Sequence, residues 1–408
     1  MTVMKKILII AGLLAAIISC SKVTIVEEAD DLVGFDTFAL RTASAKAGDS
    51  YIGGSKTATT NIPVDSKFGV FAYLHKGNSS TGTVGEWSST VNENRSNLML
   101  NYWVQRQEPT PGTYTYYYPR SEWRYWPKNT TDRISFFAYY PYAANAFEVG
   151  EDAEGDGTGI TLQDPEDDHY GYAHNPVGFP KFKFVVNTDA SKQVDFMISD
   201  MCLNQSKKAD YLTGEGDVKF TFHHMLSQIR IKKIDFVLDN DAVQIDSVQF
   251  KFLGVPVSGI CTPSIISSPD GRGNAAMAFN WSGFNSNNSE FTTTFYDESG
   301  TDAEKRAAVM LMIPHQFDVE DPDKDVVEVT FRVNREDYLG NGEYYTYKGH
   351  LRTSLSAGGL TGWERNKIYN YSITVTLNAI EFSVETEDWP EASTDVNTIK
   401  VDLENLDD

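Results

Sequence analysis

Cysteine and basic residues are scarce in this chain. Only 3 of its 408 residues are cysteine, and 35 lysines and arginines stand against 57 aspartates and glutamates, for a formal charge of −22. A surface this acidic repels the phosphate backbone, so we expect no nucleic-acid partner. It is equally unsuited to electrostatic docking on anionic lipid. Cys202 and Cys261 are either a disulfide or two buried thiols, and the sequence leaves both open.

The sequence also lacks the short motifs that mark common catalytic and metal sites. It has no His-Glu-x-x-His, no nucleophile-elbow pattern and no Rossmann glycine set. Residues 321–325 alternate carboxylates as a calcium loop does, but Val326 and Arg332 stand where an EF-hand needs glycine and glutamate. His223 and His224 are neighbours on an expected strand, so their rings diverge and do not share a metal. We therefore expect no metal, no cofactor and no enzymatic activity.

Long apolar runs are absent except at the N-terminus. Lys5 and Lys6 precede an apolar stretch over residues 7–18, which Ser19 and Cys20 follow. As a helix this stretch rises only about 18 Å, too short for a bilayer core of about 30 Å, which is typical of an export signal. Residues 17–20 resemble a bacterial lipobox, in which the cysteine receives a diacylglycerol and becomes the new N-terminus. We predict that residues 1–19 are a lipoprotein signal peptide and that Cys20 carries lipid.

Alternation of apolar and polar residues dominates the rest of the chain. It is clearest at residues 68–75, 134–140, 182–186, 194–198, 218–222, 229–231, 248–252, 327–333 and 369–377. This period of two, with β-branched and aromatic residues, predicts half-buried strands and an all-β protein of antiparallel sandwiches. The polar, turn-rich segment 203–217 predicts a boundary between domains over residues 20–214 and 215–408.

Aromatic residues are densest between residues 114 and 126, where Trp123 and Trp126 lie. Such rings stack on sugars in some proteins, but they fill a sandwich core more often. Burial is therefore the favoured interpretation. Trp123 and Trp126 remain candidate glycan contacts.

Five stretches resemble the fimbrillin, or Mfa-like, family of type V pilins. They occur in the family's order at residues 123–127 with 133–141, 194–197, 218–229, 311–316 and 363–369. The resemblance implies two transthyretin-like antiparallel β-sandwich domains in tandem. It also implies export as an outer-membrane lipoprotein, trimming by a surface protease after an arginine, and assembly by donor-strand exchange.

Carried to this sequence, the resemblance makes residues 20–41 a removable first strand. Arg41 matches the cleavage position, although Lys46 is a basic alternative and Arg41 is otherwise a solvated charge at a strand end. Val33 and Phe35 point to one side of the strand, and their burial would contribute about 3–6 kcal/mol. Phe38 breaks the alternation, a break that a bulge is able to absorb.

The donor strand in this family comes from the C-terminal region of a second subunit. Ile380, Phe382 and Val384 form the last strong alternation, and a weaker one follows over residues 399–403. Either stretch is a candidate donor. The other interpretation of each is a fixed edge strand of its own domain.

The leading functional prediction is a structural subunit of a cell-surface fimbria that acts in adhesion. Its expected partners are other fimbrial subunits, outer-membrane lipid through Cys20, and a host protein or glycan. The alternative is a surface-anchored glycan-binding lipoprotein that is not polymerised.

Overall fold

The computed structural model describes most of the chain after residue 61 and two short pieces before it. The described residues are 33, 35–39, 62, 65–87, 96–110, 113–119, 124–144, 146, 158–163, 178–207, 218–237, 243–267, 273–287, 289–295, 299–301, 304, 308–318, 320–321, 323–335, 343–351, 360–376, 380–388 and 397–401.

The regular secondary structure of the described residues is almost entirely β-strand, which confirms the all-β prediction. The first strands are β1 (Phe35–Ala39), β2 (Lys67–His75), β3 (Met99–Thr110), β4 (Thr113–Tyr117), β5 (Arg133–Tyr140), β6 (Ile160–Gln163), β7 (Lys181–Val185), β8 (Met197–Ser199) and β9 (Met201–Gln205). A single turn of 3-10 helix, η4 (Ala190–Lys192), lies between β7 and β8.

The later strands are longer on average. They are β10 (Val218–His224), β11 (Ser227–Val237), β12 (Val243–Leu253), β13 (Ser258–Ser267), β14 (Gly273–Asn285), β15 (Glu290–Thr293), β16 (Val309–Met312), β17 (His315–Gln316), β18 (Val326–Arg335), β19 (Glu343–His350), β20 (Gly362–Trp363), β21 (Lys367–Thr376), β22 (Ile380–Asp388) and β23 (Asn397–Val401). Most coincide with the stretches that alternate in the sequence.

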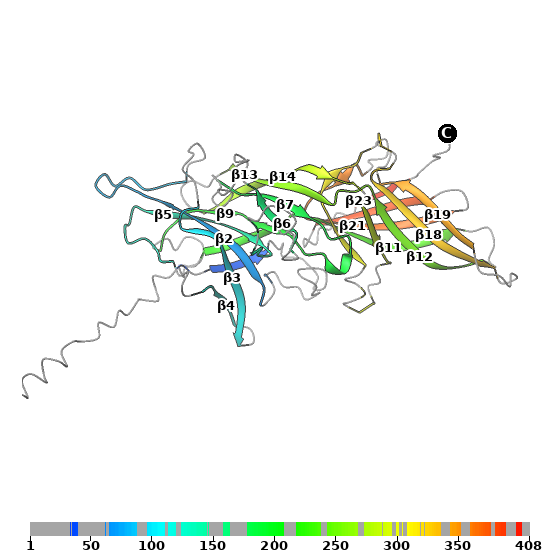
Figure 1. Ribbon diagram of the computed structural model, residues 1–408, viewed down its shortest axis with the longest axis horizontal. Helices are drawn as coiled ribbons and strands as arrows, with labels where there is room; N and C mark the ends of the chain where they lie inside the picture. The colour runs from blue at the N-terminus through cyan, green and yellow to red at the C-terminus, as the bar shows by residue number, and fades with distance from the viewer. Residues whose placement is uncertain are drawn as a thin grey trace, which may run out of the picture.

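The strands form several sheets along an elongated body (Figure 1). A 12-stranded sheet runs in the order β1-β10-β8-β5-β9-β14-β13-β7-β6, with β2, β3 and β4 attached through β5. A 5-stranded sheet runs β16-β11-β21-β22-β23, and a 4-stranded sheet runs β15-β12-β18-β19. Strands β2, β3 and β5 lie at one end of the body, whereas β12, β18 and β19 lie at the other (Figure 1).

Buried side chains form two separate clusters, one on each face of β2 and β5. The larger, which we call the large core, takes Phe71 and Tyr73 from β2 and continues through to Tyr371 and Val384 in the 5-stranded sheet. The other, the small core, consists of Val33, Ile62, Phe68, Val70, Ala72, Met99, Val104, Tyr118, Trp126, Ile134, Phe136, Ala138, Tyr140, Met197, Cys202, Val218, Phe220 and Phe222. Because both faces of this sheet are covered, β5 is buried along its whole length.

Strand pairing crosses the expected boundary at residue 214. Strand β10 pairs with β8, β13 pairs with β7, and β14 pairs with β9, so three strands from the second half complete the sheet of the first half. Long-range partners of this kind are not encoded in local alternation. The division into two domains stays a prediction.

Cys202 and Cys261 are both buried, and neither forms a disulfide. Cys202 belongs to the small core and Cys261 to the large core, where its Sγ lies 3.9 Å from the Met225 Sδ. Of the two interpretations left open by the sequence, the structure therefore has buried thiols. Burial raises the pKa of both, which keeps them protonated and unreactive.

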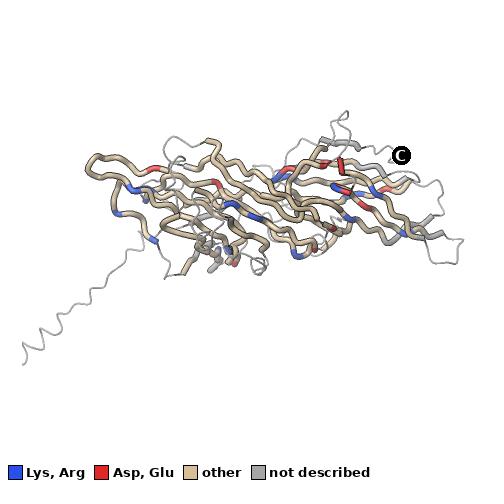
Figure 2. The backbone as a smooth tube through the Cα atoms, turned by 45° about the horizontal axis from the view of Figure 1, so that its top comes forward, with Lys and Arg blue, Asp and Glu red and all other residues tan. Residues whose placement is uncertain are grey.

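Charged residues of both signs are scattered along the described chain (Figure 2). No helix within the described ranges is both long and apolar enough to cross a membrane. The same residues contain no group of three or more histidine, cysteine, aspartate or glutamate side chains placed to hold a metal ion.

Candidate functional site

The first strand lies at one end of the large sheet and is held there by a parallel partner. Phe35 to Ala39 of β1 pair in register with Val218 to Phe222 of β10, without interruption. No bulge interrupts this pairing at Phe38. The reason is that β1 begins at Phe35 and ends at Ala39, so Phe38 sits inside a short continuous ladder.

Val33 anchors the chain just before β1. Its side chain is 0% exposed and belongs to the small core. Its backbone N–H donates to the Arg124 carbonyl at 3.0 Å, and its carbonyl accepts from the Tyr118 hydroxyl at 3.0 Å. Burial of one valine contributes about 1.5–3 kcal/mol. Val33 is thus held by its side chain and by both of its main-chain polar groups.

The C-terminal strands form an edge in another sheet, in the opposite half of the body from β1 (Figure 1). Strand β22 carries Ile380, Phe382 and Val384, and it is paired on both sides, with β21 and with β23. Val384 is 0% exposed and part of the large core. Among the described strands, β23 pairs with β22 alone, from Asn397 to Val401, so this later stretch is the edge strand of the sheet.

Several predicted site residues lie outside the described residues. They are Cys20, Arg41 and Trp123. Phe35, Ile380 and Phe382 are placed in strands by their backbones. The lipidation and processing sites therefore stay predictions.

Trp126 is buried, with 6% of its side chain exposed. Its ring packs edge-on against Phe136, with centroids 5.9 Å apart, inside the small core. A ring in this position has no free face on which to stack a sugar. The geometry favours the core interpretation of Trp126 over the glycan contact.

The two adjacent histidines each meet a different carboxylate, as their divergence predicts. His224 is buried, and its Nδ1 lies 2.8 Å from the Asp195 Oδ2. His223 lies half-buried on the other face, with its Nε2 2.8 Å from the Asp200 Oδ1. Both pairs join β10 to the chain around β8, so they brace the strand on which β1 rests.

A third histidine–carboxylate pair has no signal in the local sequence. The His315 Nε2 lies 2.7 Å from the Asp325 Oδ1, and its Nδ1 lies 2.9 Å from the Ile313 carbonyl. The Asp325 Oδ2 accepts the Asp318 N–H at 2.6 Å. Asp325 belongs to the carboxylate-rich segment that resembled a calcium loop. The carboxylate at the end of this segment lies against a histidine.

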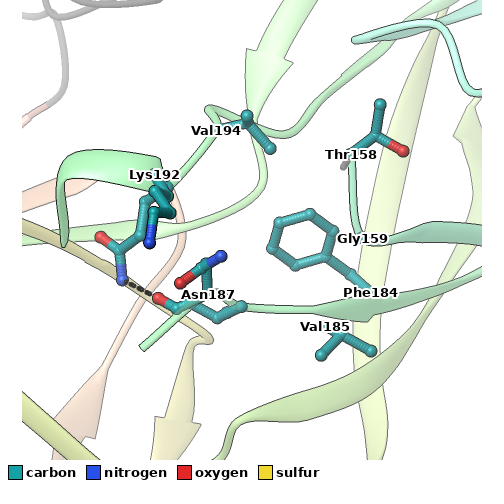
Figure 3. A pocket seen from close by; sticks show the side chains of 9 residues that line it. Thr158, Gly159, Phe184, Val185, Asn187, Lys192 and Val194 are labelled. Carbon is teal, nitrogen blue, oxygen red and sulfur yellow. Dashed lines mark hydrogen bonds between the residues drawn. The ribbon is translucent and has the colours of Figure 1, made fainter. Parts of the chain in front are cut away.

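One small cavity, of about 120 Å³, lies where β6 and β7 meet the segment around η4. In Figure 3 the Phe184 ring faces this space, beside Asn187 and Lys192, and the Gln193 side chain donates to the Asn187 carbonyl at 2.9 Å. Small-molecule sites usually measure about 300–1,000 Å³. The cavity is therefore too small for an oligosaccharide.

Comparisons with known proteins agree with this architecture. The structure is similar to a fimbrial protein from Bacteroides vulgatus ATCC 8482, with 19% identity, a TM-score of 0.52, and coverage of 88% of this chain and 99% of that one. It is also similar to a candidate cell adhesion protein from Bacteroides uniformis ATCC 8492, at 13% identity and a TM-score of 0.42, over 88% and 99% of the two chains. Another such protein, from Bacteroides ovatus ATCC 8483, matches at 15% identity and a TM-score of 0.40, over 88% and 98%.

No curated protein matches the sequence. The first structural neighbour shares the fold, and at its level of identity it shows the fold alone. The sequence match is more specific, because residues 55–389 fit the family described as fimbrillin-like. This range covers well over half of the chain and includes the strands that form both cores. The chain belongs to the fimbrillin-like family.

Proposed function

We propose that this protein is a structural subunit of a cell-surface fimbria, assembled by exchange of its first strand for a strand of a second copy. The observation that carries the proposal is the position of β1. It ends the large sheet, pairs with β10 on one side, and leads from Val33, whose side chain fills the small core. A terminal strand with one partner is the kind that leaves without unravelling a sheet.

Release of the strand would follow cleavage after Arg41. Residues 42–61 are rich in serine, threonine, alanine, glycine and lysine, a composition that offers little apolar surface to bury and suits a protease site. Loss of residues 20–41 would remove Val33 from the small core and leave the β10 edge unpaired. Such an edge accepts an added strand.

The best donor in this chain is the segment around β23. Withdrawing β22 would break its ladders with β21 and β23 and remove Val384 from the large core. Withdrawing β23 breaks one ladder, over residues 397–401. The cost difference favours β23 as the strand that leaves its own subunit to enter the next.

Cys20 would act as a delivery anchor in this scheme. Lipid on Cys20 would hold the precursor at the outer membrane while the attached strand keeps the small core closed. Cleavage would then separate subunit from lipid, so that the polymer forms at the cell surface.

The proposal is tested by limited digestion of the mature precursor, residues 20–408, with a protease that cleaves only after arginine. We expect release of a short N-terminal peptide and SDS-resistant ladders from the wild type, and neither from Arg41→Ala. Lys46→Ala is the matched control and should behave as the wild type. Ladders that form equally well with Arg41→Ala would contradict release at this position, and an efficiently trimmed subunit that stays monomeric would contradict strand exchange.

A further inference from the structure

Val33 makes two hydrogen bonds that do not belong to any β-ladder. Its N–H donates to the Arg124 carbonyl and its carbonyl accepts from the Tyr118 hydroxyl, each at 3.0 Å. The Tyr118 hydroxyl also lies 3.4 Å from the Arg124 backbone nitrogen, which donates to it. Tyr118 and Arg124 therefore contact each other as well as both polar groups of one residue.

The two residues that hydrogen-bond Val33, Tyr118 and Arg124, are positioned by strands other than β1. The Arg124 Nε donates to the Leu98 carbonyl at 3.0 Å, next to the start of β3. Its guanidinium lies over the Tyr102 ring at 4.8 Å and also hydrogen-bonds the Tyr102 hydroxyl. Tyr118 directly follows β4, which pairs with β3. The two gripping residues are thus positioned by the β3–β4 hairpin.

The Tyr118 hydroxyl is set up to donate at neutral pH. It is nearly buried, and burial raises its pKa to about 12, partly opposed by its hydrogen bond with the Arg124 backbone and by the Arg124 charge. Only the protonated phenol has a hydrogen to give to the Val33 carbonyl. A neutral donor in an apolar surrounding holds its acceptor more firmly than it would in water.

The burial and the hydrogen bonds at Val33 impose different requirements on the strand residue that lies there. Burial selects its side chain, and the hydrogen bonds select its backbone groups. The small core selects an apolar side chain, whereas the Arg124 carbonyl needs a free N–H and so rejects proline. Without an occupant, the carbonyl and the hydroxyl would each lose their 3.0 Å bond to Val33 and would keep the longer contact of 3.4 Å in which the hydroxyl donates to the carbonyl, which is less favourable. The Tyr118 hydroxyl and the Arg124 carbonyl consequently favour a bound strand over an empty position, and they fix which residue of the strand lies at this point.

We propose that Tyr118 and the Arg124 carbonyl form a main-chain clamp that holds the strand seated beside β10 and sets its register at one residue. In the precursor this residue is Val33. The extension to assembly rests on the proposed function: after release, the same clamp receives an apolar residue of the strand from a second copy. Tyr118 and Arg124 are positioning residues in either state.

The clamp is tested in the uncut mature protein, before any assembly. Hydrogen exchange, resolved to single residues, is measured at the Val33 amide relative to the amide of Val70 in β2, which belongs to the same small core, for the wild type, Tyr118→Phe and Arg124→Ala. We expect this ratio to rise about tenfold in both variants, which corresponds to the net loss of about one buried hydrogen bond. Tyr344→Phe, which removes a hydroxyl from an exposed tyrosine of β19, is the control and should leave the ratio unchanged.

The ratio decides the outcome even if a variant is less stable, because loosening of the whole small core raises exchange at Val33 and Val70 together. An unchanged ratio in Tyr118→Phe and Arg124→Ala would overturn the clamp. This result would leave the proposed fimbrial function standing. Conversely, failure of the trimmed wild-type subunit to polymerise would contradict the proposed function. A raised exchange ratio in the variants would still support the clamp on Val33.

Discussion

Single buried polar residues carry much of the specificity of this fold. Asp325 has a left-handed backbone, with φ of 52°, which aspartate and asparagine tolerate better than most residues. From this position its carboxylate accepts bonds from both His315 and the Asp318 backbone. The pair thereby ties β17 to the start of β18. None of this is visible in sequence, because a carboxylate-rich segment predicts a solvated loop or a cation site.

Asp325→Asn should destabilise the protein by about 1–3 kcal/mol. The amide keeps the backbone conformation but removes the charge and replaces one buried acceptor by a donor. Urea unfolding at neutral pH measures the change in free energy. Asp323→Asn, an exposed neighbour in the same segment, should stay within about 0.5 kcal/mol. Equal effects of the two substitutions would contradict a structural role for the Asp325–His315 pair.

His75 should make the protein less stable in mild acid. Desolvation lowers its pKa from 6.5 to about 4 in the folded state, where its Nε2 lies 3.1 Å from the Ser135 Oγ. Between these pH values the unfolded chain binds a proton that the folded chain does not. The contribution is therefore complete above pH 6.5 and is lost as pH falls toward 4, to an extent of about 1–3 kcal/mol after allowance for partial exposure.

Chemical denaturation of the wild type and His75→Gln at pH 4.5 and pH 7 measures this contribution. We expect the loss of stability between the two pH values to be smaller in the variant by the amount given above. His350→Gln serves as the comparison, since it also removes one histidine. An identical pH dependence for the wild type and His75→Gln would contradict the assignment.

At the scale of elements, local alternation predicts most strands but not their partners. Phe68, Val70 and Ala72 alternate in the sequence and indeed face one core together, within β2. The parallel pairing of β1 with β10 joins residues more than 180 positions apart, and no local pattern encodes it. The Tyr118 hydroxyl and Arg124 carbonyl that hold Val33 were likewise beyond sequence reasoning, because a main-chain contact leaves no motif.

Removal of residues 397–408 should leave a subunit able to accept a strand but unable to donate one. Because β23 lies at an edge, we expect the truncated precursor to fold with at most a small loss of stability. After trimming it should accept a strand from an intact subunit but donate none, so it should cap growing ladders. Mixtures of intact and truncated subunits, followed on SDS gels, measure this as a shift to shorter ladders.

Val384→Ala is the comparison on the neighbouring strand. It removes buried apolar volume from the large core and should cost about 1.5–3 kcal/mol while leaving ladder length unchanged. Shorter ladders with Val384→Ala, and normal ladders with the truncated subunit, would identify β22 as the donor instead.

For the whole molecule, the division into two cores allows the first strand to leave the small core without disturbing the large core. Val33, β10 and the β2–β3 region share the small core, whereas the 5-stranded and 4-stranded sheets pack in the large core. The sequence predicts which apolar residues are buried, but it does not predict that they divide into two cores. The division depends on which face of β2 and β5 each neighbouring strand covers. A strand that leaves the small core therefore need not disturb the other end of the molecule.

Trimming should accordingly loosen one core only. In trimmed monomer kept dilute, amides of β10 should exchange faster than in the precursor, whereas those of β21 should be unchanged. Hydrogen exchange by mass spectrometry on both forms gives this comparison directly. Equal acceleration in β10 and β21 would show that the cores are coupled and that the first strand supports the whole fold.

The removable first strand is tested most directly by N-terminal sequencing of the mature protein recovered from the cell surface. Strand exchange predicts a chain that begins at Thr42, immediately after Arg41, with Val33 and the lipid of Cys20 gone. A surface form that still begins at a lipidated Cys20 would contradict it and would make Cys20 a permanent tether.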